Sequence, residues 1–170
     1  MDSFPFDDDV FEAPLLLKPL NLRLNVSFMQ EGEAARPTAR QLTALEHFQS
    51  LPTTLPTSIQ PHALKYCDRI DDIVCLAEEG IHIDRANIAK HYQLTDLVIP
   101  PLADTSANFF FLTADCDWEP EHGMQIVLDG NDILYCDDHT TLAFGAAWTR
   151  ILSAPNTERG AALRAEVEKL

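Results

Sequence analysis

Eight consecutive residues, Cys116 to Gly123, form the densest group of chemically capable side chains in this chain. They read Cys-Asp-Trp-Glu-Pro-Glu-His-Gly and lie between two apolar segments. A connection of this kind carries functional residues more often than the strands it joins. Three kinds of site are consistent with these residue types: a metal centre, an acid–base catalytic site and a surface that binds another protein.

A metal centre would use the thiolate, carboxylate and imidazole groups that zinc and iron take as ligands. The spacing matches no recognised ligand pattern, and one loop rarely supplies a complete tetrahedral set. A hairpin turn at residues 129–132 would bring His139 near this loop and enlarge the set. Within the loop the candidate ligands are Cys116, Asp117, Glu121 and His122. A metal-binding hydrolase or metal sensor that uses Asp117, Glu121, His122 and His139 is therefore the alternative function.

Acid–base catalysis would use Glu121 or His122 as the base, with support from Asp138 or His139. Such a site also needs a positioned nucleophile or an oxyanion donor. The sequence contains no Gly-x-Ser-x-Gly, no glycine-rich phosphate loop and no His-Glu-x-x-His. We therefore predict a protein that is not an enzyme and that uses no cofactor.

The favoured interpretation of the loop is a surface that binds a protein. Trp118 would anchor the loop in the core, and Pro120 would stiffen it, so that less entropy is lost when a partner docks. The acidic side chains would then face solvent or the partner. The predicted partner-binding residues are Asp117, Trp118, Glu119, Glu121, His122, Asp137, Asp138 and His139.

The charge of the chain narrows the class of partner. Its 12 Lys and Arg residues stand against 27 Asp and Glu residues, which gives a formal net charge of −15. Between Lys90 and Arg150 there is no Lys or Arg, although that stretch holds ten acidic residues. Such a surface repels nucleic acids and anionic membranes, and it attracts basic proteins. We expect a basic protein partner, no nucleic acid and no membrane, and the sequence leaves the oligomeric state open.

The periodicity of apolar residues predicts the elements that position the loop. Strict alternation over 20–28 predicts a half-buried strand with residues 15–17 as its hairpin partner. Helices are expected over 38–48, from Thr57 to near Gly80 and, beginning at Asp84, as far as Tyr92. Apolar runs predict strands at 97–99, 109–112, 124–128 and 133–136, the last two joined by a hairpin turn.

Strands and helices that are segregated along the chain predict an α+β fold with an antiparallel sheet and helices mainly on one face. The chain divides into an acidic flexible lead-in (1–13), one domain (14–155) and a C-terminal amphipathic helix (156–170). The four cysteines are expected to be free thiols. With no secretory signal and no membrane-spanning stretch, we expect a cytoplasmic protein.

The cluster also resembles a bacterial family of small proteins classed as a domain of unknown function, seen among immunity-type proteins of polymorphic toxin systems. The likeness is carried by Phe109 to Leu112, by Cys116 to Leu128 with its Cys-Asp-Trp-x-x-Glu-His-Gly core, by the turn at Gly130 and by Asp138-His139-Thr140. Asp138 departs from the glycine expected before the late histidine. The resemblance implies a partner of a toxin, or a protein of unassigned role, and no catalytic residue.

Together these observations predict a non-enzymatic protein-binding domain of immunity type that neutralises a basic toxin or effector by occlusion. A third hypothesis is an adaptor that binds partners through its C-terminal helix.

Overall fold

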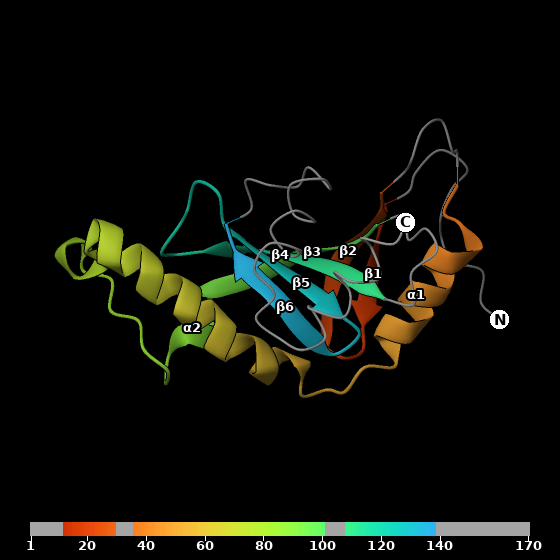
Figure 1. Cartoon of the computed structure of the whole chain (residues 1–170), viewed down its shortest axis with the longest axis horizontal. Coiled ribbons are helices and arrows are strands. Elements are labelled where there is room, and N and C mark those ends of the chain that lie inside the picture. The colour runs from red at the N-terminus through yellow and green to blue at the C-terminus, as the bar shows by residue number, and fades with distance from the viewer. Residues whose placement is uncertain (1–11, 30–35, 101–107, 139–170) are drawn as a thin grey trace, which may run out of the picture.

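A six-stranded sheet forms the frame of the protein, with the strands in the spatial order β1-β2-β3-β4-β5-β6 (Figure 1). The computed structural model describes residues 12–29, 36–100 and 108–138. The strands are β1 (Glu12–Leu17), β2 (Leu22–Phe28), β3 (Tyr92–Ile99), β4 (Phe109–Cys116), β5 (Met124–Asp129) and β6 (Asp132–Asp137). Two α-helices, α1 (Ala39–Gln49) and α2 (Leu55–Val74), and two short 3-10 helices, η1 (Leu76–Glu79) and η2 (Ile88–Lys90), complete the described elements.

The sheet is mixed, so the predicted antiparallel α+β fold is wrong. β2 and β3 pair in parallel, with Val26 opposite Leu97, whereas every other neighbouring pair is antiparallel. Both α-helices lie in the connection between β2 and β3. A crossover of this length returns the chain to the end of the sheet where β2 began, and the next strand then runs parallel to β2.

The two predicted hairpins are present. β1 and β2 form one through the turn at residues 18–21, and β5 and β6 form the other through the turn at Gly130, which has a φ of +57°. β4 lies in the interior of the sheet, as its apolar run predicts. Phe110 packs edge to face on Phe48 of α1, with ring centroids 5.0 Å apart, while Phe109 and Phe111 alternate to the other face and are also buried. Burial on both faces explains why this strand is continuously apolar.

Gln41 connects helix α1 to the two parallel strands. Its side chain is fully buried and donates from Nε2 to the carbonyls of Met29 (2.7 Å) and Ile99 (3.2 Å), which follow β2 and end β3. Its Oε1 accepts from the backbone N–H of Thr38, and the Thr38 hydroxyl accepts from the Gln41 N–H. The predicted capping box therefore forms, and the same side chain fixes the helix to the sheet.

Helix α2 begins and ends earlier than its pattern predicts. It begins at Leu55, after Thr54 and with Pro56 in its first turn, where a missing N–H costs nothing. It ends at Val74, because Cys75 adopts a left-handed conformation with a φ of +56°. The helix predicted from Asp84 to Tyr92 is wrong: Asp84 caps only a turn, through bonds to Ala86 and Asn87, and Tyr92 already belongs to β3.

Strand β1 forms one edge of the sheet in the described residues, and two of its carbonyls accept hydrogen bonds from side chains. The carbonyl of Pro14 accepts from Arg23 (3.2 Å) and that of Leu16 accepts from Gln49 of α1 (3.1 Å). Pro14 itself has no N–H to offer. The edge is therefore a poor template for a further strand.

The strand β1 begins inside the predicted acidic lead-in, two residues before the expected domain boundary at residue 14. The predicted C-terminal helix over 156–170 lies outside the described residues. Within the described segments, every helix is too short or too polar to span a lipid bilayer. The four cysteines are free thiols.

Candidate functional site

The loop of residues 117–123 connects β4 to β5 and is held by backbone hydrogen bonds at both ends. The N–H of Asp117 donates to the carbonyl of His91 (2.9 Å), which ties the loop to the start of β3. The N–H of Gly123 donates to the carbonyl of Glu119 (2.8 Å), and the hydroxyl of Tyr66 on α2 donates to the carbonyl of Gly123 (3.3 Å). The loop is thus fixed to both the sheet and α2.

Trp118 supports the loop from inside. Its side chain is 2% exposed and packs edge to face between Tyr66 and Tyr92, with ring centroids 6.1 Å and 6.3 Å away. Its indole N–H finds no hydrogen-bond partner in the described part of the chain. The ring therefore sets the position of its acidic neighbours and offers little surface of its own.

Gly123 lets the loop close against β4. It has a φ of +66°, a conformation that side chains disfavour. A Cβ at this position would lie 2.5 Å from the carbonyl oxygen of Ala114. The loop can therefore enter β5 in this way only with glycine at position 123.

Two histidines each pair with a carboxylate of the loop. Nδ1 of His91 lies 2.9 Å from Oδ2 of Asp117, and Nδ1 of His122 lies 3.1 Å from Oε1 of Glu119. The Cys116 thiol next to them is buried, which raises its pKa to about 12. A thiol of this kind stays protonated near neutral pH, so Cys116 acts as a packing group and is poorly suited to be a nucleophile.

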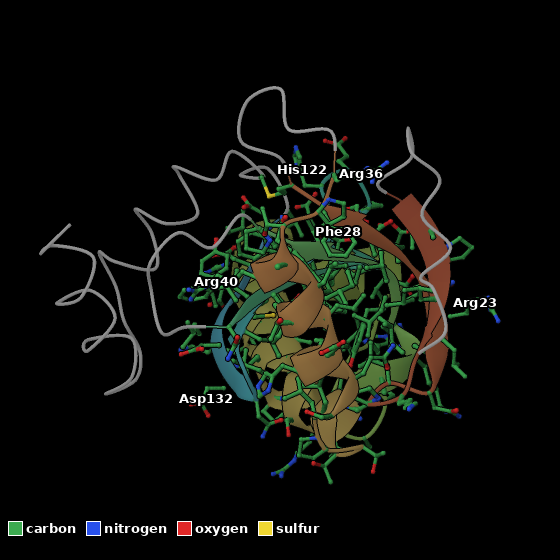
Figure 2. All side chains as sticks on the ribbon, turned by 90° about the vertical axis from the view of Figure 1, so that its right-hand side faces the viewer. Arg23, Phe28, Arg36, Arg40, His122 and Asp132 are labelled. Atoms are coloured by element: carbon green, nitrogen blue, oxygen red, sulfur yellow. The ribbon has the colours of Figure 1, made fainter. Side chains whose placement is uncertain are left out.

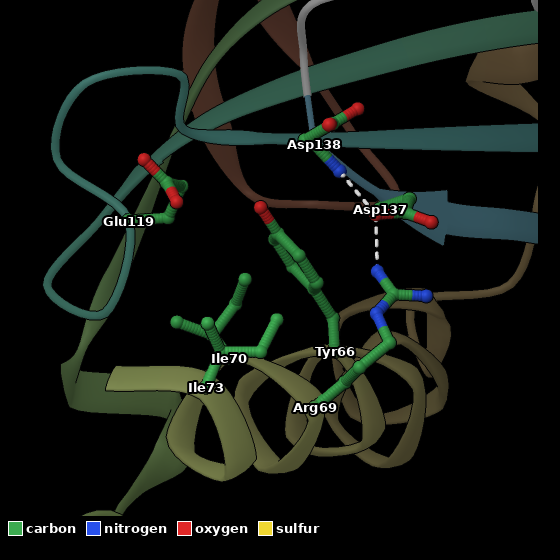
Figure 3. Close-up of a pocket in the computed structure, with 7 residues that line it drawn as sticks. All are labelled: Tyr66, Arg69, Ile70, Ile73, Glu119, Asp137 and Asp138. Atoms are coloured by element: carbon green, nitrogen blue, oxygen red, sulfur yellow. Dashed lines mark hydrogen bonds and ion pairs between the residues drawn. The ribbon is translucent and has the colours of Figure 1, made fainter. Parts of the chain in front are cut away.

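A groove of about 300 Å³ lies between α2 and this loop (Figure 3). Helix α2 forms its floor with Tyr66, Arg69, Ile70 and Ile73. Its opposite walls are Glu119 of the loop, on one side of the Tyr66 ring, and Asp137 and Asp138 at the end of β6, on the other.

Arg69 pairs with Asp137 inside the groove and lies over the ring of Tyr66, 5.3 Å from its centroid. Burial is the main cause that raises the pKa of the Tyr66 hydroxyl, and the negative charges of Glu119, Asp137 and Asp138 add to it. Tyr66 therefore remains a neutral hydrogen-bond donor. Three carboxylates and one guanidinium line the groove, which makes it negatively charged overall.

The structure brings three of the predicted partner-binding residues together and places the others around them. Glu119, Asp137 and Asp138 share the groove, although Glu119 is 18 or more positions from the other two along the chain. Asp117, Glu121 and His122 are exposed on the loop beside it, and Trp118 is buried beneath. His139 lies outside the described residues.

The floor of the groove comes from residues that the sequence suggested only as a helix face. Tyr66, Ile70 and Ile73 follow the helical spacing of a core stripe, yet Ile73 is 74% exposed and Val74 is 49% exposed. The signal that could have revealed them is the length of α2: its apolar stripe continues past the part of the helix that the sheet covers.

Among residues 12–29, 36–100 and 108–138, no three His, Cys, Asp or Glu side chains gather closely enough to hold a metal ion. Two of the predicted ligands, Asp117 and His122, are paired with His91 and Glu119.

Negative charge is concentrated at one end of the described structure. Residues 66–91, 115–123 and 137–138, which we call the acidic end, are linked by the contacts between Tyr66 and Gly123, Arg69 and Asp137, and His91 and Asp117 (Figure 1, left). They contain twelve carboxylates and three Lys or Arg, a net charge of −9. The other described residues contain five of each and are neutral. Figure 2 views the molecule from the α1 end, where Arg23 and Arg40 project outward along with Asp132.

The fold and the groove define a small mixed α/β domain with an acidic, partly apolar surface site. Residues 3–143 match the family described as Domain of unknown function (DUF6985), and the chain belongs to that family. This agrees with the resemblance to a domain of unknown function; the motif, the bacterial source and the link to immunity proteins are finer statements that the match does not address. Comparison with curated proteins and with solved structures found no match.

Proposed function

We propose that this protein is a non-enzymatic binding domain of immunity type, which neutralises a basic toxin or effector in the bacterial cytoplasm by covering its working surface. The observation that carries the proposal is the acidic end, with its net charge of −9 against a neutral remainder. An asymmetric charge of this size steers a cationic partner toward one side of the molecule and raises the rate of encounter.

The loop of residues 117–123 supports the same proposal. Its backbone bonds to His91 and Tyr66 and the buried Trp118 hold it in one conformation. A surface that is already ordered loses less entropy on binding, so a larger share of the contact energy appears as affinity. Glu121 and Asp115 are both exposed and contribute two of the negative charges of the acidic end.

The test is capture of the partner by the full chain, followed by co-expression. Tagged wild-type protein serves as bait in a lysate of the source cells, and captured proteins are identified by mass spectrometry. A double variant, Asp115→Lys with Glu121→Lys, reverses charge at the acidic end. The matched control, Glu46→Lys with Asp132→Lys, changes two exposed acids elsewhere.

We expect a basic protein to be captured by the wild type and by the control, and to be lost with the acidic-end variant. Co-expression with that protein should relieve its toxicity. A captured partner that is not basic, or that binds all three baits equally, would contradict the proposal.

A further inference from the structure

We infer that the groove between α2 and the 117–123 loop receives an arginine side chain of the partner, with an apolar residue beside that arginine covering Ile73 and Val74. This inference rests on the proposed function and names the chemistry of the contact. The alternatives, a free small cation or a lysine side chain, are distinguished by the experiment below.

Charge is the first reason. Glu119, Asp137 and Asp138 place three carboxylates in the groove, and Arg69 supplies one positive charge. The lining residues therefore carry a formal net charge of about −2. Arg69 pairs with Asp137, and Glu119 also contacts the imidazole of His122. An arriving cation reduces the repulsion among these carboxylates.

Arg69 shows how a guanidinium is accommodated here. It pairs with Asp137 and stacks over the aromatic ring of Tyr66, 5.3 Å from the centroid. The carboxylates lie on both sides of that ring, Glu119 from the loop and Asp137 and Asp138 from the end of β6 (Figure 3). A planar guanidinium can donate to carboxylates in more than one direction and lie along apolar surface, whereas an ammonium acts as a single strongly hydrated charge.

The apolar floor favours a protein over a free cation. Ile73 is 74% exposed and Val74 is 49% exposed, at the end of α2 beside the groove. A free polyamine would leave this surface in water, whereas a polypeptide can cover it with the residue next to the arginine. The volume of about 300 Å³ lies at the lower limit for small-molecule pockets and suits one long side chain.

The experiment is an NMR titration of the isotopically labelled full chain with acetylated, amidated Gly-Arg-Leu-Gly. Matched peptides carry lysine, or the neutral isostere citrulline, in place of arginine, and spermidine serves as the free cation. We expect saturable shifts at residues 66–74, 119 and 137–138, with a Kd of about 1 mM because one side chain supplies most of the contact. Citrulline should weaken binding about tenfold or more, and lysine should bind more weakly than arginine.

Two variants test the two halves of the groove. Glu119→Gln removes one carboxylate, and Ile73→Ser removes the apolar contact; each should weaken binding of the arginine peptide several-fold. The matched control, Leu16→Ser, changes a side chain that is 52% exposed on β1 and should leave the titration unchanged. Thermal unfolding of each variant verifies that the fold is intact.

Equal shifts with arginine and citrulline, tighter binding of spermidine than of the arginine peptide, or no shift up to about 10 mM peptide would overturn the inference. The experiments also distinguish a failure of the groove assignment from a failure of the proposed function. If the captured partner is lost with the charge-reversal variant but binds Glu119→Gln and Ile73→Ser as it binds the wild type, the neutralising role stands and the groove assignment is wrong.

Discussion

Gly123 shows how one residue controls the geometry of the candidate site. Its left-handed backbone and its closeness to the Ala114 carbonyl allow Tyr66 to hydrogen-bond the turn from below. Any side chain would push the loop away from β4. The position of Glu119 then depends on a residue that carries no chemistry itself.

We expect Gly123→Ala to lower the free energy of unfolding by about 3 kcal/mol, from backbone strain and the clash with Ala114. Gly80→Ala is the control, since Gly80 also has a positive φ, of +78°, but has open space within 4 Å of the place a Cβ would take. Gly80→Ala should lower the free energy of unfolding by about 1 kcal/mol. Urea unfolding measures both; equal losses would show that the contact with Ala114 is unimportant.

The buried thiols predict a loss of stability at alkaline pH. Burial raises the pKa of Cys67 to about 11 and that of Cys116 to about 12, from 9.0. The folded state therefore holds these protons after the unfolded state has released them, so stability is fully present below pH 9 and falls as pH rises toward 11–12.

The urea midpoint should be lower at about pH 10 than at about pH 8, and the decrease should be smaller in Cys67→Ala. The urea midpoint of Cys75→Ala should decrease between these pH values as much as that of the wild type, because Cys75 is exposed. A midpoint that does not change between the two pH values would contradict the burial of these thiols.

At the scale of elements, Gln41 is the residue that joins α1 to β2 and β3. Parallel pairing of these strands depends on a long crossover, and Gln41 bonds the carbonyls at the ends of both strands. Buried carbonyls that lose a side-chain donor are left with fewer hydrogen bonds than they can accept, which is costly.

We expect Gln41→Ala to lower the free energy of unfolding by about 3 kcal/mol, whereas Thr38→Ala, which loses only the helix cap, should lower it by about 1 kcal/mol. Chemical denaturation distinguishes the two. Similar losses would mean that Gln41 acts only as part of the cap.

Local patterns predict much of this fold, and pairing between distant strands is what they miss. The apolar run of β4 and the Asp129–Asp132 turn identify their elements, because burial and turn chemistry are properties of a few adjacent residues. Nothing local marks β2 and β3 as parallel neighbours. Ile88 and Tyr92 have helical spacing by coincidence: one ends up in a 3-10 turn and the other in a strand.

The residues of the candidate site also divide into those that local sequence predicts and those that it does not. Glu119, Asp137 and Asp138, which are half-buried, are predictable as acids near one hairpin, since both ends of the hairpin meet. Arg69 and Ile73 could not be predicted as site residues. They lie on α2, which is distant in sequence from the hairpin, and the apolar stripe of this helix is indistinguishable from a core face.

At the scale of the whole molecule, we expect the acidic end to steer the proposed basic partner. Long-range attraction between exposed charges is screened by salt over about 10 Å at 0.1 M. We expect the association rate constant with the captured partner to fall tenfold or more between about 20 mM and 500 mM NaCl, while the dissociation rate changes less.

Stopped-flow measurements across this range make the test. Asp115→Lys with Glu121→Lys should associate more slowly at low salt and respond less to added salt, and Glu46→Lys with Asp132→Lys should behave as the wild type. An association rate that is independent of salt would remove steering from the mechanism.

The occupied carbonyls of β1 have a consequence for how copies of this protein behave when concentrated. Pro14 lacks a donor there, and Arg23 and Gln49 occupy two of the acceptors that a further strand would need. Edge-to-edge pairing of one sheet with the next, the route by which exposed edges grow into filaments, is therefore disfavoured on this side. We expect recognition of other molecules to depend instead on side chains of the acidic end, where it can be selective.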